Sequence, residues 1–216
     1  MRCRAVLFDL DGTLLDTLKD IANSANKALR HLGFPQHELE AYKYFVGDGR
    51  EILAIRTLPE HHRDPATVSK LAASINEEYS KHWADSTCPY QGVPELLNAL
   101  TISNIKMAIL SNKPHSFTEI MVSRLLLPWH FEIVVGALPS VPKKPDPTTA
   151  LQISRRLGIP SSEFLYLGDS EVDMKTATAA DMYPVGALWG FRTADELLVG
   201  GAKKLIDHPT DLLRLL

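Results

Sequence analysis

Two aspartates close the first apolar run of the chain. The run spans residues 5–10 (AVLFDL), and Asp9 and Asp11 stand at its end, directly before Gly12. In a strand, side chains two residues apart point the same way, so the two carboxylates share a direction. Two adjacent carboxylates repel each other, and a divalent cation between them removes the repulsion. Taken alone, the pair is more typical of aspartates that cap a loop.

Further polar groups follow later apolar runs. Ser111 and Asn112 follow one run, Lys144 precedes a proline, and Asp169 and Asp173 follow another run. Taken singly, these residues are typical of turns, of a solvated surface and of the first turn of a helix, except for Asp169, which none of these explains. Ligands of open α/β sheets, however, bind beyond the carboxyl ends of the strands. There the carboxylates suit Mg²⁺, whereas the lysine, hydroxyl and amide suit a phosphate.

The apolar runs predict the elements that position these groups. The runs cover residues 5–10, 105–110, 131–135, 164–167 and 183–188. Short runs of this kind are typical of strands buried on both faces of a parallel sheet. From residue 105 onward they alternate with helical patterns over residues 117–127, 148–157 and 172–180. This alternation predicts an α/β fold with right-handed crossovers.

A long gap separates the first predicted strand from the second. A βαβ unit needs about 30 residues, but here one strand ends near residue 10 and the next begins near residue 105. Helical patterns fill the gap at about residues 21–32, 38–46, 50–58 and 66–83. We therefore predict a discontinuous α/β core, residues 1–15 and 90–216, with a helical domain, residues 16–89, inserted after the first strand.

Composition excludes several classes of protein. The 216 residues include 23 Lys and Arg and 26 Asp and Glu, a net charge of −3. This balance argues against a partner that is a nucleic acid or a membrane surface. No stretch approaches the ~18 consecutive apolar residues of a membrane span. An export signal needs an uninterrupted apolar run, and Asp9 interrupts the N-terminal run, so we expect no export signal. Cys3 and Cys88 lack metal-site spacing and are typical of reduced cysteines, so we expect a cytoplasmic protein.

In combination, the motifs resemble those of the haloacid dehalogenase-type phosphohydrolases, the HAD superfamily. The matching segments, in order, are residues 9–13, 111–112, 144–147 and 168–173. The resemblance spans essentially the whole chain. It implies a Rossmann-like parallel sheet whose first strand is central and flanked by the second and fourth. It also implies that the helical insertion is the superfamily's cap domain.

Within the superfamily, the chain most resembles the phosphoglycolate phosphatase group. The stretches that carry this similarity are residues 45–53 (FVGDGREIL), 111–114 (SNKP) and 188–197 (LWGFRTADEL). One departure is Asp181, where the family usually has glycine. Aspartate tolerates the left-handed conformation of a helix end better than most residues, so the fold assignment is unaffected.

The resemblance implies a role for each core residue. Asp9 would be the nucleophile that forms an aspartyl-phosphate, and Asp11 the general acid and then base. Mg²⁺ would be held by the Asp9 side chain, the Asp11 backbone carbonyl and Asp169. Asp173 would bind the metal directly or through water. Lys144 would stabilise charge on the transferring phosphoryl group.

Other residues are expected to bind the substrate. Thr13, Ser111 and Asn112 would position the phosphoryl group. The cap would close over the site and set substrate choice, with Arg50 as the first candidate for binding a substrate carboxylate. Further candidates, each equally typical of a solvated surface, are Lys43, Tyr44 and Arg56 of the cap and Lys113 and His115 of the core.

The predicted function is Mg²⁺-dependent hydrolysis of a small phosphate ester through an aspartyl-phosphate, with 2-phosphoglycolate as the candidate substrate. A β-phosphoglucomutase-like isomerase and a pyrophosphatase or nucleotidase share the same core and stay open as alternatives. A rival of another class is a non-enzymatic phospho-acceptor of a signalling system. Asp11 argues against that rival, because fast release of phosphate needs a nearby acid and base. The oligomeric state is left open between a monomer and a homodimer.

Overall fold

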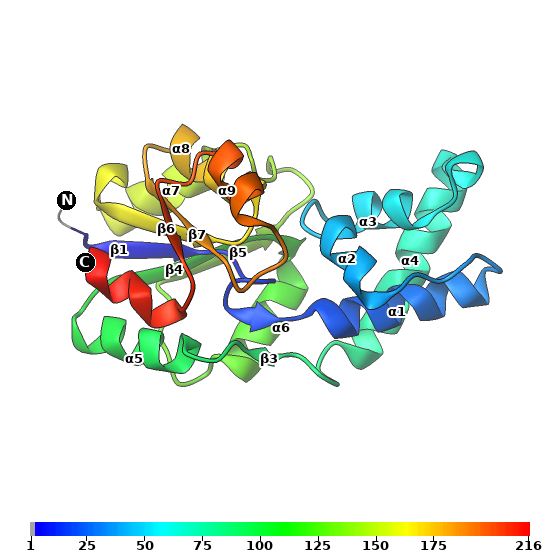
Figure 1. Cartoon of the computed structure of the whole chain (residues 1–216), viewed down its shortest axis with the longest axis horizontal. Coiled ribbons are helices and arrows are strands. Elements are labelled where there is room, and N and C mark those ends of the chain that lie inside the picture. The colour runs from blue at the N-terminus through cyan, green and yellow to red at the C-terminus, as the bar shows by residue number, and fades with distance from the viewer. Residues whose placement is uncertain (1–2) are drawn as a thin grey trace. The chain divides into compact units, whose positions relative to one another are not determined.

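The computed structural model describes residues 3–216 (Figure 1). The chain divides into two compact units. One comprises the residues up to Leu15 together with Pro89–Leu216, and the other is Asp16–Cys88. We call them the core unit and the helical unit.

The core unit contains a six-stranded sheet in which every strand pairing is parallel. Its strands are β1 (Ala5–Phe8), β4 (Lys106–Pro114), β5 (Ile133–Ala137), β6 (Phe164–Gly168), β7 (Tyr183–Ala187) and β8 (Lys204–Ile206). The spatial order is β5-β4-β1-β6-β7-β8. The first strand is therefore central, between β4 and β6, and the predicted α/β class with a Rossmann-like parallel sheet is confirmed.

Register places the polar strand ends at one edge of the sheet. Phe8 of β1 is level with Ile109 of β4 and with Leu167 of β6. All four residues of β1 are completely buried, as an apolar run in the centre of a parallel sheet requires. Because parallel strands run in the same direction, the residues that follow these three positions emerge at the same edge.

Helices cover both faces of this sheet (Figure 1). They are α5 (Val93–Ile102), α6 (His115–Leu125), α7 (Thr148–Leu157), α8 (Glu171–Ala179) and α9 (Ala194–Gly200), with 3₁₀ turns η2 (Ser161–Glu163) and η3 (Pro209–Leu215). Leu7 and Tyr166 belong to the same buried apolar cluster as Ile153 of α7 and Ala177 of α8. This packing holds α8, which begins directly after β6, against the sheet.

The helical unit contains the four helices expected in the gap. They are α1 (Leu18–His31), α2 (Leu39–Phe45), α3 (Arg50–Thr57) and α4 (Pro65–His82), with a 3₁₀ turn η1 (Glu60–His62). Local signals explain the helix ends. Gly33 has a φ of 78° where α1 stops, and the Asp64 side chain accepts hydrogen bonds from the first backbone N–H groups of α4.

Two short strands lie where the chain passes from one unit to the other. β2 (Leu15–Asp16) and β3 (Cys88–Pro89) form a separate two-stranded sheet where the chain crosses from one unit to the other. The function of the helical unit as a cap stays a prediction.

Within residues 3–216, no helix combines the length and the apolarity that a membrane span requires.

Candidate active site

Three buried carboxylates converge at the carboxyl edge of the central strands. Asp9 follows β1, and Asp169 and Asp173 lie after β6 and in the first turn of α8. One oxygen from each carboxylate lies within 4.8 Å of the other two. None of the three residues is more than 7% exposed. The structure thus brings together three of the four aspartates that the sequence predicts at one site.

Lys144 joins the carboxylates from the loop between β5 and α7. Its Nζ donates to Asp9 Oδ1 at 2.7 Å and to Asp173 Oδ1 at 2.6 Å. Its side chain is 3% exposed, so it is not the solvated lysine of the alternative interpretation. Asn112 fixes the loop, because its amide donates to the Lys144 carbonyl at 3.1 Å and its Oδ1 accepts from the Lys144 N–H at 3.0 Å.

Asp169 is held by groups from two other segments. The backbone N–H of Phe191 donates to Asp169 Oδ2 at 2.8 Å, and the Thr13 hydroxyl reaches Asp169 Oδ1 at 3.4 Å. Gly12, with a φ of 82°, and Gly190 lie so close that a Cβ at either position would collide with the Asp169 side chain. These two positions therefore require glycine. Phe191 and Gly190 lie in the quoted segment 188–197, but no feature of the sequence connects them to Asp169.

Asp173 caps a helix and also belongs to the carboxylate cluster. Its Oδ2 accepts from the Ser170 N–H at 3.2 Å, and its own N–H donates to the Ser170 hydroxyl at 3.3 Å, which makes a capping box for α8. Its Oδ1 accepts from Lys144 and, at 3.5 Å, from the Tyr166 hydroxyl. The cap of the helix thus orients a carboxylate of the site.

Asp11 stands apart from the three buried carboxylates and contacts a different lysine. Lys113 Nζ lies 3.0 Å from both Asp11 Oδ1 and Asp11 Oδ2. The Lys113 side chain is 5% exposed and that of Asp11 is 20% exposed. Sequence analysis placed Lys113 among the substrate-binding candidates. Its partner was missed because the two residues are far apart in the sequence and meet only through the pairing of β1 with β4.

Burial is the main cause of the shifted carboxylate pKa values in the cluster. Burial, and next the repulsion from Asp173, raises the pKa of Asp169 to about 7. Burial also raises the pKa of Asp9 well above its ordinary value, although attraction to Lys144 opposes this. For Lys144, burial alone would lower the pKa, but the attraction of Asp173 and Asp9 outweighs it and raises the pKa well above its ordinary value.

The donor set fits Mg²⁺. The three clustered groups offer only carboxylate oxygens, the ligands that this hard cation prefers. With all three ionised and Lys144 protonated, two negative charges stay uncompensated, and a divalent cation would supply that charge. Asp9, Asp169 and Asp173 are thus the side chains that would hold it.

The other predicted residues lie in different surroundings. Ser111 is buried beside the site at the end of β4, and its hydroxyl accepts from the Lys113 N–H at 3.2 Å. Arg50 is the first residue of α3 in the helical unit and donates to Asn76 at 2.5 Å. Its role toward a substrate stays a prediction. Of the further candidates, Lys43 pairs with Glu40, Arg56 with Asp48 and His115 with Glu119.

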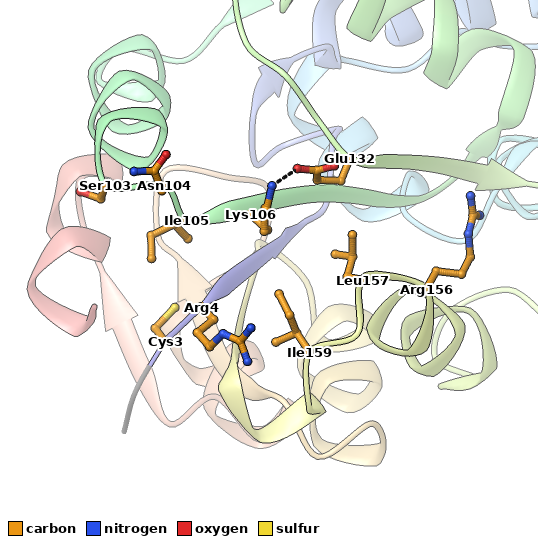
Figure 2. Close-up of a pocket in the computed structure, with 10 residues that line it drawn as sticks. All are labelled: Cys3, Arg4, Ser103, Asn104, Ile105, Lys106, Glu132, Arg156, Leu157 and Ile159. Atoms are coloured by element: carbon orange, nitrogen blue, oxygen red, sulfur yellow. Dashed lines mark hydrogen bonds and ion pairs between the residues drawn. The ribbon is translucent and has the colours of Figure 1, made fainter.

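A surface hollow lies at the opposite, amino-terminal edge of β1 and β4 (Figure 2). Its volume is about 560 Å³. Lys106 there pairs with Glu132 at 2.6 Å, as the dashed line in Figure 2 shows, and Arg4 pairs with Glu163 at 3.0 Å. Two of the three basic residues that line the hollow are thus paired with carboxylates, and the third is Arg156.

The chain is similar to known proteins over most of its length. Residues 6–187 match the family model described as haloacid dehalogenase-like hydrolase. A phosphoglycolate phosphatase of Pseudomonas savastanoi pv. phaseolicola is 31% identical over 216 residues, which cover 99% of this chain and 78% of the relative. A phosphoglycolate phosphatase of Aquifex aeolicus is 30% identical, with 99% of this chain and 96% of the relative covered.

Solved structures show the same architecture. A crystal structure from Lactobacillus delbrueckii subsp. bulgaricus, with phosphoglycolate phosphatase as its suggested activity, matches with a TM-score of 0.93 and 27% identity. The match covers 100% of this chain and 98% of that one. The chain therefore belongs to the haloacid dehalogenase-like hydrolase family. Within that family it is a phosphatase of the phosphoglycolate phosphatase-like type, as its curated relatives show.

Proposed function

We propose that this protein is a Mg²⁺-dependent hydrolase of small phosphate esters, with 2-phosphoglycolate as its substrate. The observation that carries the proposal is the contact of one buried ammonium, Lys144, with Asp9 and Asp173 beside the carboxylate of Asp169. The names of the curated relatives support the choice of substrate. Small phosphate esters are accordingly the partners that we propose.

Asp9 is the proposed nucleophile. Lys144 holds its Oδ1 at 2.7 Å, which leaves Oδ2 to attack phosphorus. A bond from Asp9 to phosphorus forms as the bond from phosphorus to the ester oxygen breaks, which gives an aspartyl-phosphate and the alcohol. When bound, Mg²⁺ would offset the repulsion between phosphate and carboxylates and stabilise charge on the transferring oxygens.

Asp11 is the proposed general acid and base. In the first step it donates its proton to the leaving ester oxygen. In the second step its carboxylate accepts a proton from the water that attacks phosphorus, while the bond between Asp9 and phosphorus breaks. Phosphate leaves, and Asp9 and Asp11 return to their starting states. Thr13 and Ser111 keep their predicted role in binding the phosphoryl oxygens.

The test is phosphate release by the wild-type protein and by Asp9→Asn. We expect the wild type to hydrolyse 2-phosphoglycolate and p-nitrophenyl phosphate when Mg²⁺ is present and to stop when a chelator removes it. Asp9→Asn replaces the attacking oxygen by a poor nucleophile, so kcat should fall by roughly 10⁴-fold or more. Asp195→Asn, an exposed position in α9, is the matched control and should keep wild-type activity.

A substrate panel separates the remaining alternatives by kcat/KM. The proposal predicts that 2-phosphoglycolate exceeds pyrophosphate, nucleoside monophosphates and β-glucose 1-phosphate. Conversion of β-glucose 1-phosphate to its 6-phosphate isomer would identify a mutase instead. Wild-type activity in Asp9→Asn would overturn the assignment of the nucleophile. Stable phosphorylation without any turnover would favour the phospho-acceptor.

A further inference from the structure

We propose that Lys113 is a positioning residue that fixes the carboxylate of Asp11 for proton transfer. The inference rests on the proposed function, in which Asp11 is the general acid and base. It replaces the sequence-based expectation that Lys113 binds the substrate. The two residues lie in the core unit, at the carboxyl ends of the neighbouring strands β1 and β4.

The contact between the two side chains constrains Asp11 strongly. The Lys113 ammonium lies 3.0 Å from each carboxylate oxygen, so it contacts both Oδ1 and Oδ2. Asp11 itself follows the end of β1 and precedes Gly12, whose φ of 82° starts a tight turn. Its side chain is 20% exposed, so neighbouring packing alone does not lock it. A two-point contact to a buried ammonium supplies the missing constraint.

The backbone of Lys113 is itself held in place. Its N–H donates to the Ser111 hydroxyl at 3.2 Å, and its carbonyl accepts from the Thr118 hydroxyl at 3.3 Å. Thr118 is completely buried. Gly136 of β5 lies so close that a Cβ there would be 2.6 Å from the Lys113 carbonyl oxygen. A side chain on such a rigid support can orient its neighbour with the accuracy that proton transfer needs.

The position of Asp11 matters because proton transfer is sensitive to geometry. A shift of about 1 Å in a reacting group can cost about 10²-fold in rate. In the acid form, one carboxyl oxygen of Asp11 carries the proton and Lys113 contacts the other. After the proton has passed to the leaving oxygen, the ammonium holds the resulting carboxylate through both oxygens. That carboxylate is then in place to accept the proton of the attacking water in the second step.

The experiment compares Lys113→Met with the wild type on three substrates that differ in leaving group and charge. Ethyl phosphate and 2-phosphoglycolate release poor alkoxide leaving groups and need a proton, whereas p-nitrophenyl phosphate releases a stable phenolate. The value of kcat/KM depends only on the steps up to release of the alcohol, so the later hydrolysis of the phosphoenzyme does not affect it. We expect losses of about 10²-fold for both alkyl esters and a far smaller loss for p-nitrophenyl phosphate.

Two further variants test that Lys113 acts through Asp11. In an Asp11→Asn background, Lys113→Met should cause no additional loss of kcat/KM, since the residue it positions is gone. Lys113→Arg should restore part of the activity on ethyl phosphate, because a guanidinium also contacts both oxygens of a carboxylate. The control is Lys106→Met, which removes an exposed ion pair from the opposite end of β4 and should leave all three kcat/KM values unchanged.

Other patterns would overturn the inference. A loss confined to 2-phosphoglycolate would mean that Lys113 binds the substrate carboxylate. Equal losses on all three substrates, or full additivity with Asp11→Asn, would mean that the lysine only supports the fold. If the wild type itself releases no phosphate from any of the three, the proposed function fails, and this inference fails with it.

Discussion

At the scale of single residues, the carboxylate cluster combines close packing with incomplete neutralisation. Asp173 caps α8 through one oxygen and contacts Lys144 through the other. Asp169 is enclosed by two glycine positions and one backbone N–H. Burial, and next the repulsion from Asp173, raises the pKa of Asp169 to about 7. This property has a measurable consequence.

We predict that Mg²⁺ stabilises the protein more above pH about 7 than below it. The pKa of Asp169 is raised to about 7, whereas an unfolded aspartate titrates near ~3.9. Between these values the native metal-free protein holds a proton that the unfolded chain has lost, so its stability falls as pH rises through this window. Mg²⁺ must displace that proton, and its affinity therefore rises over the same window.

Thermal unfolding with and without Mg²⁺ across this pH range checks the prediction. The rise in Tm on adding Mg²⁺ should increase with pH in the wild type. Asp169→Asn removes both the titrating group and a ligand, so its Tm should respond weakly to the cation at every pH. A rise in Tm that is constant with pH would contradict the proton-linked site.

Sequence patterns predicted most of the cluster but not all of its contacts. Asp9, Lys144 and Asp169 were predicted to lie together because each belongs to a motif at or near a strand end. The contact of Lys113 with Asp11 and that of Phe191 with Asp169 were not predicted. Both pairs depend on three-dimensional register and loop conformation, which no local pattern encodes.

At the scale of elements, one buried carboxylate ties the start of α1 to the segment that follows α4. Asp20 Oδ2 accepts from the Ser86 N–H at 2.9 Å and from the N–H and hydroxyl of Thr87 at 2.8 Å each. Asp20 is 1% exposed. All these residues belong to the helical unit, near the two passages between the units. The contact therefore joins the first and the last part of the chain within the helical unit.

We predict that Asp20→Ala lowers the free energy of unfolding by about 3 kcal/mol, because it leaves buried donors without an acceptor. Thr87→Val removes only one of the three donors and should cost about 1 kcal/mol. Asp85→Ala removes an exposed carboxylate in the same segment and should change stability by less than about 1 kcal/mol. Urea unfolding followed by circular dichroism measures all three, and equal effects of Asp20→Ala and Asp85→Ala would refute the prediction.

The accuracy of the predicted elements differs along the chain. The helix over residues 148–157 coincides with α7, and the strand over residues 164–167 differs from β6 by one residue. The strand predicted over residues 105–110 was too short, since β4 continues to Pro114 with an irregular register after Leu110. Its polar end resembles a turn in sequence, and only pairing with β5 keeps it extended. α9 and the three-residue edge strand β8 were not predicted, because such short elements carry little periodicity. α5 was not predicted either, although it has ten residues like α7.

At the scale of the whole molecule, the strand order explains why residues from distant motifs share a site. β1 is the first strand in the sequence and lies at the centre of the sheet, with β4 and β6 on either side. The long insertion after β1 is accommodated as a compact unit with its own helices and core. Asp9 and Asp169 therefore approach each other although more than half of the chain separates them.

The central claim is that Asp9 becomes phosphorylated. The most direct measurement is rapid quenching of Asp11→Asn with p-nitrophenyl phosphate and Mg²⁺, followed by mass spectrometry of the peptides. This leaving group departs without an acid, but the second step lacks its base, so the phosphoenzyme should accumulate. We predict a burst of about one nitrophenolate per active site and a phosphoryl group on the peptide that contains Asp9. Turnover without a burst, or a phosphoryl group on another residue, would contradict the account.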